Sequence, residues 1–95
     1  MRITDENLTR LATQINKTTN SPTEPWTRNG NEVISNEGCF HVEFAYSGVT
    51  FSRMTSRTGT TTNVLQVGYI SKKDLYERMQ AFLNGIIVGK ETMRK

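Results

Sequence analysis

The pattern of apolar positions predicts an amphipathic helix at the start of the chain. Thr4 is a residue type that caps helices, and Ile3 and Leu8 occupy the two positions of a hydrophobic staple. The apolar residues recur at helical spacing: Leu8, Leu11, Ala12 and Ile15. We expect this helix to end near Lys17, before the polar stretch that leads to Pro22.

Residues 18–31 show no clear periodicity and are predicted to form a long loop. Pro22 and Pro25 bias the residues before them toward extended geometry, and Trp26 follows directly. The Asn29-Gly30 step is a turn signal, which makes residues 32–35 a short strand.

The strongest strand pattern lies between residues 39 and 58. Two alternating runs meet at a Tyr46-Ser47-Gly48 turn, which predicts a twisted antiparallel hairpin. In the first arm one face carries Phe40, Val42 and Phe44, and the other carries His41 and Glu43. In the second arm Arg53 shares a face with Val49 and Phe51 if the strand is regular, whereas a bulge would turn Met54 inward. A further strand is predicted over residues 63–69.

The last predicted element is a helix that begins after Ser71. Ser71 and Asp74 fit a capping box, and Ile70 and Leu75 repeat the staple pattern. An apolar stripe follows that is as wide as a core-facing helix requires: Leu75, Met79, Phe82, Leu83 and Ile86. We expect Gly85 or Gly89 to end this helix and the residues from Lys90 onward to fray.

Together these elements predict an α+β fold. A three- to four-stranded antiparallel sheet would carry the N- and C-terminal helices packed on its one apolar face. The opposite face would expose His41, Glu43, Thr50 and Ser52. Residues 1–89 are expected to form a single α+β domain, followed by a basic C-terminal tail at 90–95.

The charge is unevenly distributed, although the net charge is only +3. Residues 1–48 hold four basic and six acidic residues, and residues 49–95 hold eight basic and three acidic ones, which gives −2 and +5. The basic half suits nucleic acid, a nucleotide or an acidic protein, and equally an ordinary solvated surface. One cysteine, no signal-peptide pattern and no run of ~20 apolar residues lead us to expect a cytoplasmic protein.

Catalytic and metal chemistry have little support in the sequence. One His and one Cys cannot supply the four ligands of a closed zinc site. Cys39 and His41 would lie about 6.5–7 Å apart along a strand, too far for a nucleophile and its base. No phosphate-binding glycine loop and no nucleophile elbow is present. We therefore expect a protein that is not an enzyme and uses no cofactor.

Anion binding is better supported by the residue types. Cations lie at strand ends and at the start of the second helix: Arg28, Arg53, Arg57, Lys72 and Lys73. Arginine's planar fork binds phosphate, and Trp26, Tyr46 and Tyr69 offer surfaces on which a base can stack. The competing interpretation is that the arginines pair with Glu32, Glu37 or Glu43. In that case Trp26 would cover the core.

Several segments resemble small phage- and prophage-encoded proteins of unassigned function. These segments are Arg2-Ile3-Thr4, the Pro- and Trp-containing run at 16–27, Ala45-Tyr46-x-Gly48 with Arg53-Met54, Lys73 with Leu75-Tyr76-Glu77-Arg78, and Phe82-x-x-Gly85. The resemblance covers most of residues 1–85 and contains no catalytic signature. It implies phage origin and a role as an accessory or counter-defence factor, a class that includes sponges for cyclic or ADP-ribose-type nucleotide signals.

These observations lead to one functional expectation and two alternatives. We expect a non-enzymatic protein that sequesters an anionic nucleotide-derived ligand, with Arg53 and Arg57 on phosphate, supported by Arg28 and Lys72. Tyr46 or Trp26 would stack on the base. Because so short a chain encloses little volume, a homo-oligomer would complete the site. The alternatives are a nucleic-acid-binding accessory protein and a protein inhibitor of a host defence enzyme.

Overall fold

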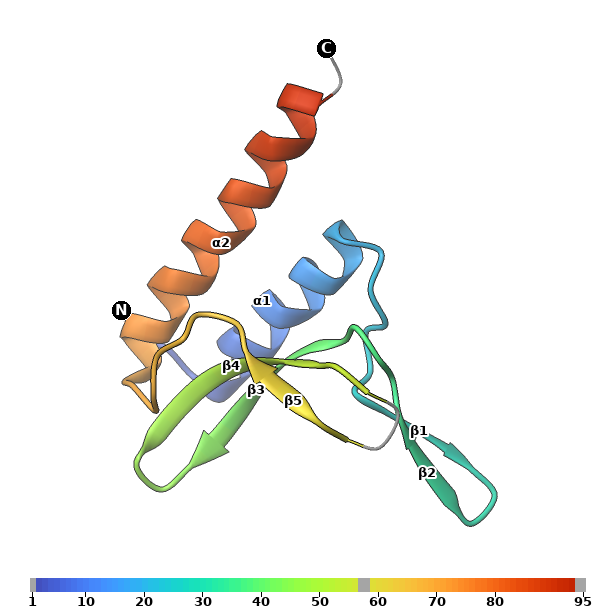
Figure 1. Ribbon diagram of the computed structural model, residues 1–95. Helices are drawn as coiled ribbons and strands as arrows, with labels where there is room; N and C mark the ends of the chain where they lie inside the picture. The colour runs from blue at the N-terminus through green and yellow to red at the C-terminus, as the bar shows by residue number, and fades with distance from the viewer. Residues whose placement is uncertain (1, 57–58, 94–95) are drawn as a thin grey trace.

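The computed structural model of the chain describes residues 2–56 and 59–93. Its elements, in chain order, are α1 (Asp5–Thr18), β1 (Trp26–Asn29), β2 (Glu32–Ser35), β3 (Phe40–Ala45), β4 (Gly48–Met54), β5 (Thr61–Asn63) and α2 (Lys72–Met93). β1 and β2 form one antiparallel sheet, and β3, β4 and β5 form a second with β4 in the centre. Figure 1 shows both helices on one side of the three-stranded sheet. The predicted α+β class is confirmed.

Each helix begins where its capping residues predict. The Thr4 side chain accepts a hydrogen bond from the Asn7 N–H (3.2 Å), and the Thr4 N–H donates to Asn7 Oδ1 (2.9 Å). At α2 the Ser71 hydroxyl accepts from the Asp74 N–H at 3.2 Å. These bonds satisfy N–H groups that have no partner within a helix. The two helix starts are therefore set by local sequence.

The core lies between the sheet and the two helices, and three phenylalanines form its centre. Phe40 stacks on Phe51 with 5.6 Å between ring centroids, and Phe82 of α2 meets both rings at 5.7 and 5.9 Å. Aliphatic and thioether side chains surround them: Leu8, Leu11, Ala12, Ile15, Val49, Leu75, Met79 and Leu83. Burial of these apolar surfaces is the main force that holds the helices on the sheet.

One polar residue is part of this interior. Asn16 is only 1% exposed, and its side-chain amide donates to the Phe40 carbonyl at 2.8 Å. Its Oδ1 accepts from the Phe40 N–H at 2.7 Å. Those two backbone groups lie on the edge of β3 that pairs with no strand of residues 2–56 and 59–93, so the Asn16 amide takes the place of a neighbouring strand.

The β3–β4 hairpin is regular along its whole length. Its register runs from Phe40 opposite Arg53 to Ala45 opposite Gly48 without an extra residue. The alternative of a bulge within this paired segment is therefore not observed, but just beyond it both Gly38 and Cys39 bond to Met54: the Gly38 N–H donates to the Met54 carbonyl (2.7 Å) and the Met54 N–H donates to the Cys39 carbonyl (2.9 Å). Met54 is nevertheless buried, at 2% exposure.

Met54 is buried because both faces of β4 are covered. Thr50 and Ser52 are 3% and 2% exposed, so the prediction that they lie on an exposed face is wrong. Asn63 donates to the Thr50 hydroxyl at 3.1 Å, and the Ser52 hydroxyl donates to Glu43 at 2.7 Å. The chain after β5 closes over this face, which the local alternation of residues could not indicate.

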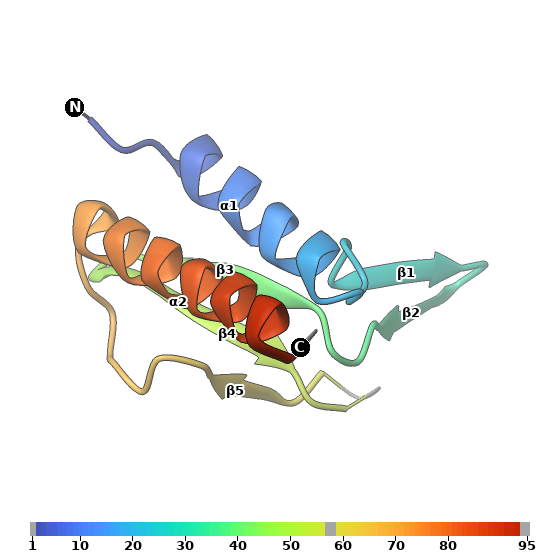
Figure 2. The same ribbon diagram turned by 90° about the horizontal axis from the view of Figure 1, so that it is seen from above.

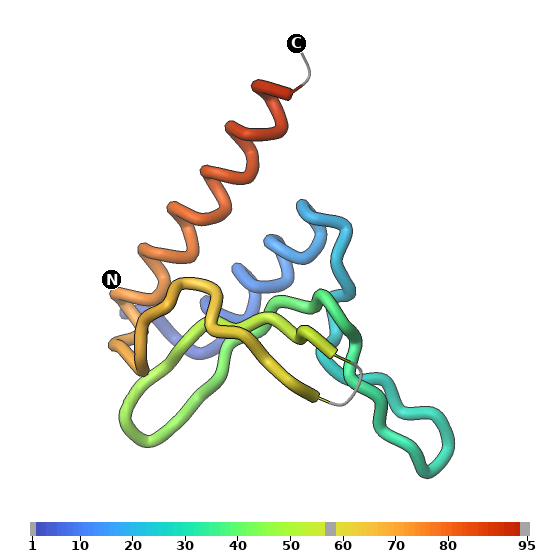
Figure 3. The backbone as a smooth tube through the Cα atoms, in the orientation of Figure 1, coloured from blue at the N-terminus to red at the C-terminus, as the bar shows by residue number. Residues whose placement is uncertain are grey.

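The strand predicted at residues 63–69 is also wrong. From residue 61 to residue 69, Thr61–Asn63 form the strand that pairs with β4, and the residues after Asn63 are irregular, with Gln66 in the left-handed region at φ 54°. Figure 3 shows this connection running back from β5 to the start of α2. A single bridge joins Val49 and Ile70 through two 2.9 Å hydrogen bonds. The apolar side chains of this segment, Val64, Leu65 and Ile70, therefore pack against the core although their backbone is not a strand.

Two further boundaries differ from the sequence prediction. The expected loop at 18–31 contains β1, which forms because its residues pair with β2 in a tight hairpin. α2 continues through Gly85 and Gly89 to Met93, so the predicted helix end is wrong and residues 90–93 of the expected tail are helical. The Lys90 ammonium group donates to the Thr18 carbonyl at the end of α1, which ties the two helix ends together.

Candidate functional site

The sequence-predicted cation cluster is not assembled among the described residues. The Arg53 guanidinium lies over the Phe40 ring, 4.6 Å from its centroid, and its Nε donates to the Gly38 carbonyl at 3.1 Å. This is a packing role at the end of the hairpin. Arg57 lies outside the described residues.

Tyr46 and Lys72 do lie near one another. Both line a hollow of about 340 Å³ where the β3–β4 turn meets the start of α2. Tyr46 is fully exposed, and the Lys72 ammonium group is 2.6 Å from the Asp5 carboxylate. An anion in this hollow would compete with Asp5 for Lys72, and an exposed pair of this kind contributes only about 0–1 kcal/mol. The hollow therefore brings together two of the predicted ligand residues, but Arg53 does not line it.

Trp26 and Arg28 lie elsewhere, on the β1–β2 hairpin. Trp26 is 47% exposed, so the interpretation that it covers the core is wrong. Arg28 is exposed and makes no ion pair with any residue in 2–56 or 59–93. The five predicted ligand residues that the structure describes are thus spread over the β1–β2 hairpin, the two ends of the β3–β4 hairpin and the start of α2, and the sixth, Arg57, lies outside the described residues.

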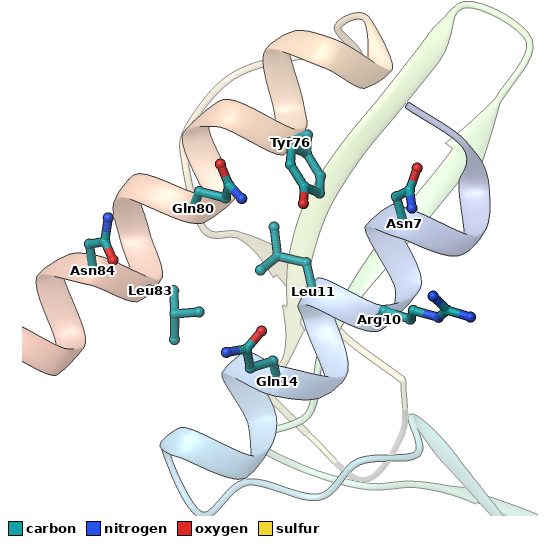
Figure 4. Close-up of a pocket in the computed structure, with 8 residues that line it drawn as sticks. All are labelled: Asn7, Arg10, Leu11, Gln14, Tyr76, Gln80, Leu83 and Asn84. Carbon is teal, nitrogen blue, oxygen red and sulfur yellow. The ribbon is translucent and has the colours of Figure 1, made fainter. Parts of the chain in front are cut away.

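A different concave surface lies between the two helices. A groove of about 450 Å³ is lined from α1 by Asn7, Arg10, Leu11 and Gln14, and from α2 by Tyr76, Gln80, Leu83 and Asn84. We call it the interhelix groove. Figure 4 shows Gln14 and Gln80 reaching toward the space between the helices, with the Tyr76 ring at one end and Asn84 at the other.

The floor of the interhelix groove is apolar and its walls are polar. Leu11 and Leu83 form the floor, and each is 6% exposed because it also packs in the core. Within the described part of the chain, the carboxamides of Gln14, Gln80 and Asn84 make no hydrogen bond to another residue. These three amides can therefore bind a ligand without breaking a protein contact.

Arg10 is the one cation in the wall of this groove, and it is partly engaged. Its guanidinium is 2.5 Å from the Glu6 carboxylate, and Figure 4 shows it turned away from α2. Exposed pairs at this helical spacing contribute only about 0.3–0.5 kcal/mol. A phosphate at the mouth of the groove could draw Arg10 away from Glu6 at little cost.

The chemistry of the groove favours binding over catalysis. Carboxamides donate and accept hydrogen bonds but do not transfer protons near neutral pH. The thiol, a possible nucleophile, lies elsewhere: Cys39 is fully buried, and burial is the main cause that raises its pKa. A hydrogen bond from Asn16 acts in the opposite direction, and the charge of Glu24 adds a smaller increase. The thiol therefore stays protonated and poorly reactive at neutral pH.

A metal centre is likewise not assembled in the part of the chain that the structure describes. No group of three or more His, Cys, Asp or Glu side chains within residues 2–56 and 59–93 could hold an ion. His41 is 3.9 Å from Glu43, and that pair has no third ligand.

Sequence reasoning missed the interhelix groove, although a signal was present. Asn7, Arg10 and Gln14 are spaced three and four residues apart on one helix face, and Tyr76, Gln80 and Asn84 are spaced four apart on another. Each face alone has the pattern of an ordinary solvated surface. Only the packing of α1 beside α2 turns the two faces into one site.

Comparisons with protein-family models, with curated proteins and with solved structures gave no match. Among the helices described, none is long and apolar enough to cross a membrane.

Proposed function

We propose that the protein is a non-enzymatic binding protein that sequesters an anionic nucleotide-derived small molecule in the interhelix groove. The observation that carries the proposal is the set of three uncommitted carboxamides above an apolar floor. Amides of this kind pair with the hydrogen-bonding edges of nucleobases. The half-buried Tyr76 ring offers a stacking surface, and Arg10 offers a fork for phosphate.

The size of the groove supports a ligand of this class. Its 450 Å³ volume falls in the range of about 300–1,000 Å³ that is common for small-molecule sites. The groove is open along one side, so it covers only part of a nucleotide, and a second copy of the chain would complete the enclosure. Cytoplasmic action and the phage-type counter-defence role implied by the sequence resemblance are part of this proposal.

The nucleic-acid alternative has less support. It relied on an exposed strand face, and Thr50 and Ser52 on that face are buried. The partly exposed side chains on the same strand face include Glu43, whose carboxylate repels phosphate. The protein-inhibitor alternative depends on Trp26, which lies on a separate surface.

Loss of groove amides should weaken ligand binding. Calorimetry of the wild-type protein against cyclic dinucleotides, cyclic trinucleotides and ADP-ribose derivatives should find a binder in this panel. Gln14→Ala and Gln80→Ala should each weaken it about 3- to 10-fold, because a net hydrogen bond contributes about 0.5–1.5 kcal/mol.

A matched control removes a carboxamide that lies outside the groove. Asn31 is exposed in the β1–β2 turn, so Asn31→Ala should leave affinity unchanged. Absence of binding across the whole panel at high micromolar concentration would overturn the proposal. Equal losses for Gln80→Ala and Asn31→Ala would remove the groove as the site.

The proposed homo-oligomer is supported by the C-terminal half of α2. Figure 1 shows this half extending beyond α1 and away from the sheet, and it exposes Ile87 (38%), Val88 (59%) and Met93 (86%). These side chains point about 100–140° apart around α2, so a second copy of the chain would cover one or two of them and remove that apolar surface from water. The covered area is small, so we expect a weak, concentration-dependent assembly.

Light scattering over a range of concentrations tests this assembly. The wild-type mass should rise with concentration, and Val88→Glu should hold the protein at the monomer mass, because the contact would bury an unpaired carboxylate. Glu77→Gln, on an exposed position of the same helix, is the control that should still assemble. A wild-type protein that stays monomeric throughout would contradict this part of the proposal.

A further inference from the structure

The β1–β2 hairpin stands apart from the core. None of its residues belongs to the buried apolar cluster, and Figures 1 and 2 show it projecting from the body of the protein. An isolated two-stranded hairpin is marginal in stability. Because this hairpin contributes no side chain to the apolar core, its exposed side chains are available for an interaction surface.

Two hydrogen bonds of Asn36 close the base of the hairpin, and one of Ser35 links the hairpin to the segment after β4. The Asn36 amide donates to the Glu24 carbonyl at 2.8 Å, and the Asn36 N–H donates to the Pro25 carbonyl at 2.8 Å. The Ser35 hydroxyl donates to the Ser56 carbonyl at 2.5 Å. A surface carried by this hairpin is therefore positioned relative to the sheet, which lowers the entropy lost on docking.

One face of the hairpin combines apolar and cationic groups. Trp26 and Arg28 are two residues apart in β1, and Val33 of β2 is directly opposite Arg28. Alternation along a strand and direct pairing across strands place all three on the same face. Trp26 is 47% exposed and Val33 is 58% exposed. We call this set the hairpin face.

The charge on this face has no partner in the described protein. Arg28 forms no ion pair with a residue in 2–56 or 59–93, and Glu32, the acid nearest to it in the hairpin, pairs with Asn29 on the opposite face. The indole is supported at its edge by Gly59, where an added Cβ would come within 3.2 Å of Trp26. A positioned aromatic ring thus shares this face with a guanidinium that has no ion pair among the described residues.

We infer that the hairpin face docks an acidic partner protein. A carboxylate of the partner accepts two parallel hydrogen bonds from Arg28, and an apolar side chain beside that carboxylate packs between Trp26 and Val33. Tryptophan and arginine are the residue types most enriched among the few that dominate interface energy. This inference is independent of the ligand proposed for the interhelix groove.

A protein fits this face better than RNA does. RNA binding depends on several cations that neutralise successive phosphates, and among residues 2–56 and 59–93 the hairpin face carries one cation, Arg28. Val33 adds apolar surface, which matches a protein side chain. The partner is therefore expected to present an acidic residue next to an aliphatic or aromatic one.

A displayed library of short random peptides supplies the test. Selection on the wild-type protein should enrich peptides in which Asp or Glu adjoins an apolar residue. Enriched peptides should lose at least 10-fold in affinity for Arg28→Glu, because the change puts two carboxylates together. Trp26→Ala should weaken the same peptides by a similar factor.

The control carries the same charge change at a distant site. Arg78 is exposed on α2, so Arg78→Glu should bind the enriched peptides as the wild-type protein does. A circular dichroism melt of each variant separates lost docking from lost folding, and Arg28→Glu at an exposed position should melt as wild type. The inference would be overturned if no peptides were enriched or if the enriched peptides lacked acidic residues. Equal binding by Arg78→Glu and Arg28→Glu, or a preference for a short RNA over the peptides, would overturn it as well.

Discussion

Replacement of Phe51 by Ala is expected to lower the free energy of unfolding by about 3–5 kcal/mol. Phe51 is fully buried, stacks on Phe40 and meets the edge of Phe82 at 5.9 Å. Its loss would leave a cavity where β3, β4 and α2 meet, and neighbouring rings cannot fill it without leaving their own contacts. The effect is a large share of the stability of a small domain.

Urea denaturation at equilibrium measures this effect, and Phe44 supplies a matched control. Phe44 lies in the same hairpin but is 48% exposed, so Phe44→Ala should change the free energy of unfolding by only about 1 kcal/mol or less. Similar destabilisation by the two changes would contradict the position assigned to the core.

Replacement of Asn16 by Ala is expected to cost about 2–5 kcal/mol. The change leaves the N–H and C=O of Phe40 without the partners that Asn16 supplies at 2.7 and 2.8 Å. Each buried backbone group left unpaired costs about 1–3 kcal/mol. Because Asn16 is only 1% exposed, water reaches the vacated groups poorly.

Two measurements separate this edge-capping role from ordinary packing. Denaturation gives the size of the loss, and amide hydrogen exchange at Phe40 should accelerate more than exchange in the rest of β3. Lys17→Ala, at the next and exposed helix position, is the control and should have little effect. Unchanged exchange at Phe40 would show that the Asn16 contact is not what protects the edge.

Local sequence predicted the parts of the fold that depend on local chemistry. The starts of α1 and α2 follow from Thr4 and Ser71, and the β3–β4 hairpin follows from its alternation. Burial of Thr50 and Ser52 was not predictable, because the segment that covers them reaches that face through an irregular path. The continuation of α2 past Gly85 shows that one glycine weakens a helix without ending it.

The candidate site was less accessible to sequence reasoning than the fold. Two long cationic side chains contact neighbouring residues of the protein: the Arg53 guanidinium lies over the Phe40 ring, and the Lys72 ammonium group pairs with the Asp5 carboxylate. The interhelix groove joins residues that are separated by most of the chain, such as Gln14 and Gln80. Neither helix face is distinctive by itself, so the site emerges only from tertiary packing.

The central claim is that the interhelix groove binds a nucleotide-derived anion, and the side-chain amide signals of Gln14, Gln80 and Asn84 report on it most directly. Nuclear magnetic resonance spectra recorded during titration with each cyclic nucleotide and ADP-ribose derivative would follow these signals. We predict that they shift and saturate with the panel member that binds. Shifts confined to Tyr46 and Lys72 or to the hairpin face, or no shift with any panel member, would contradict the claim.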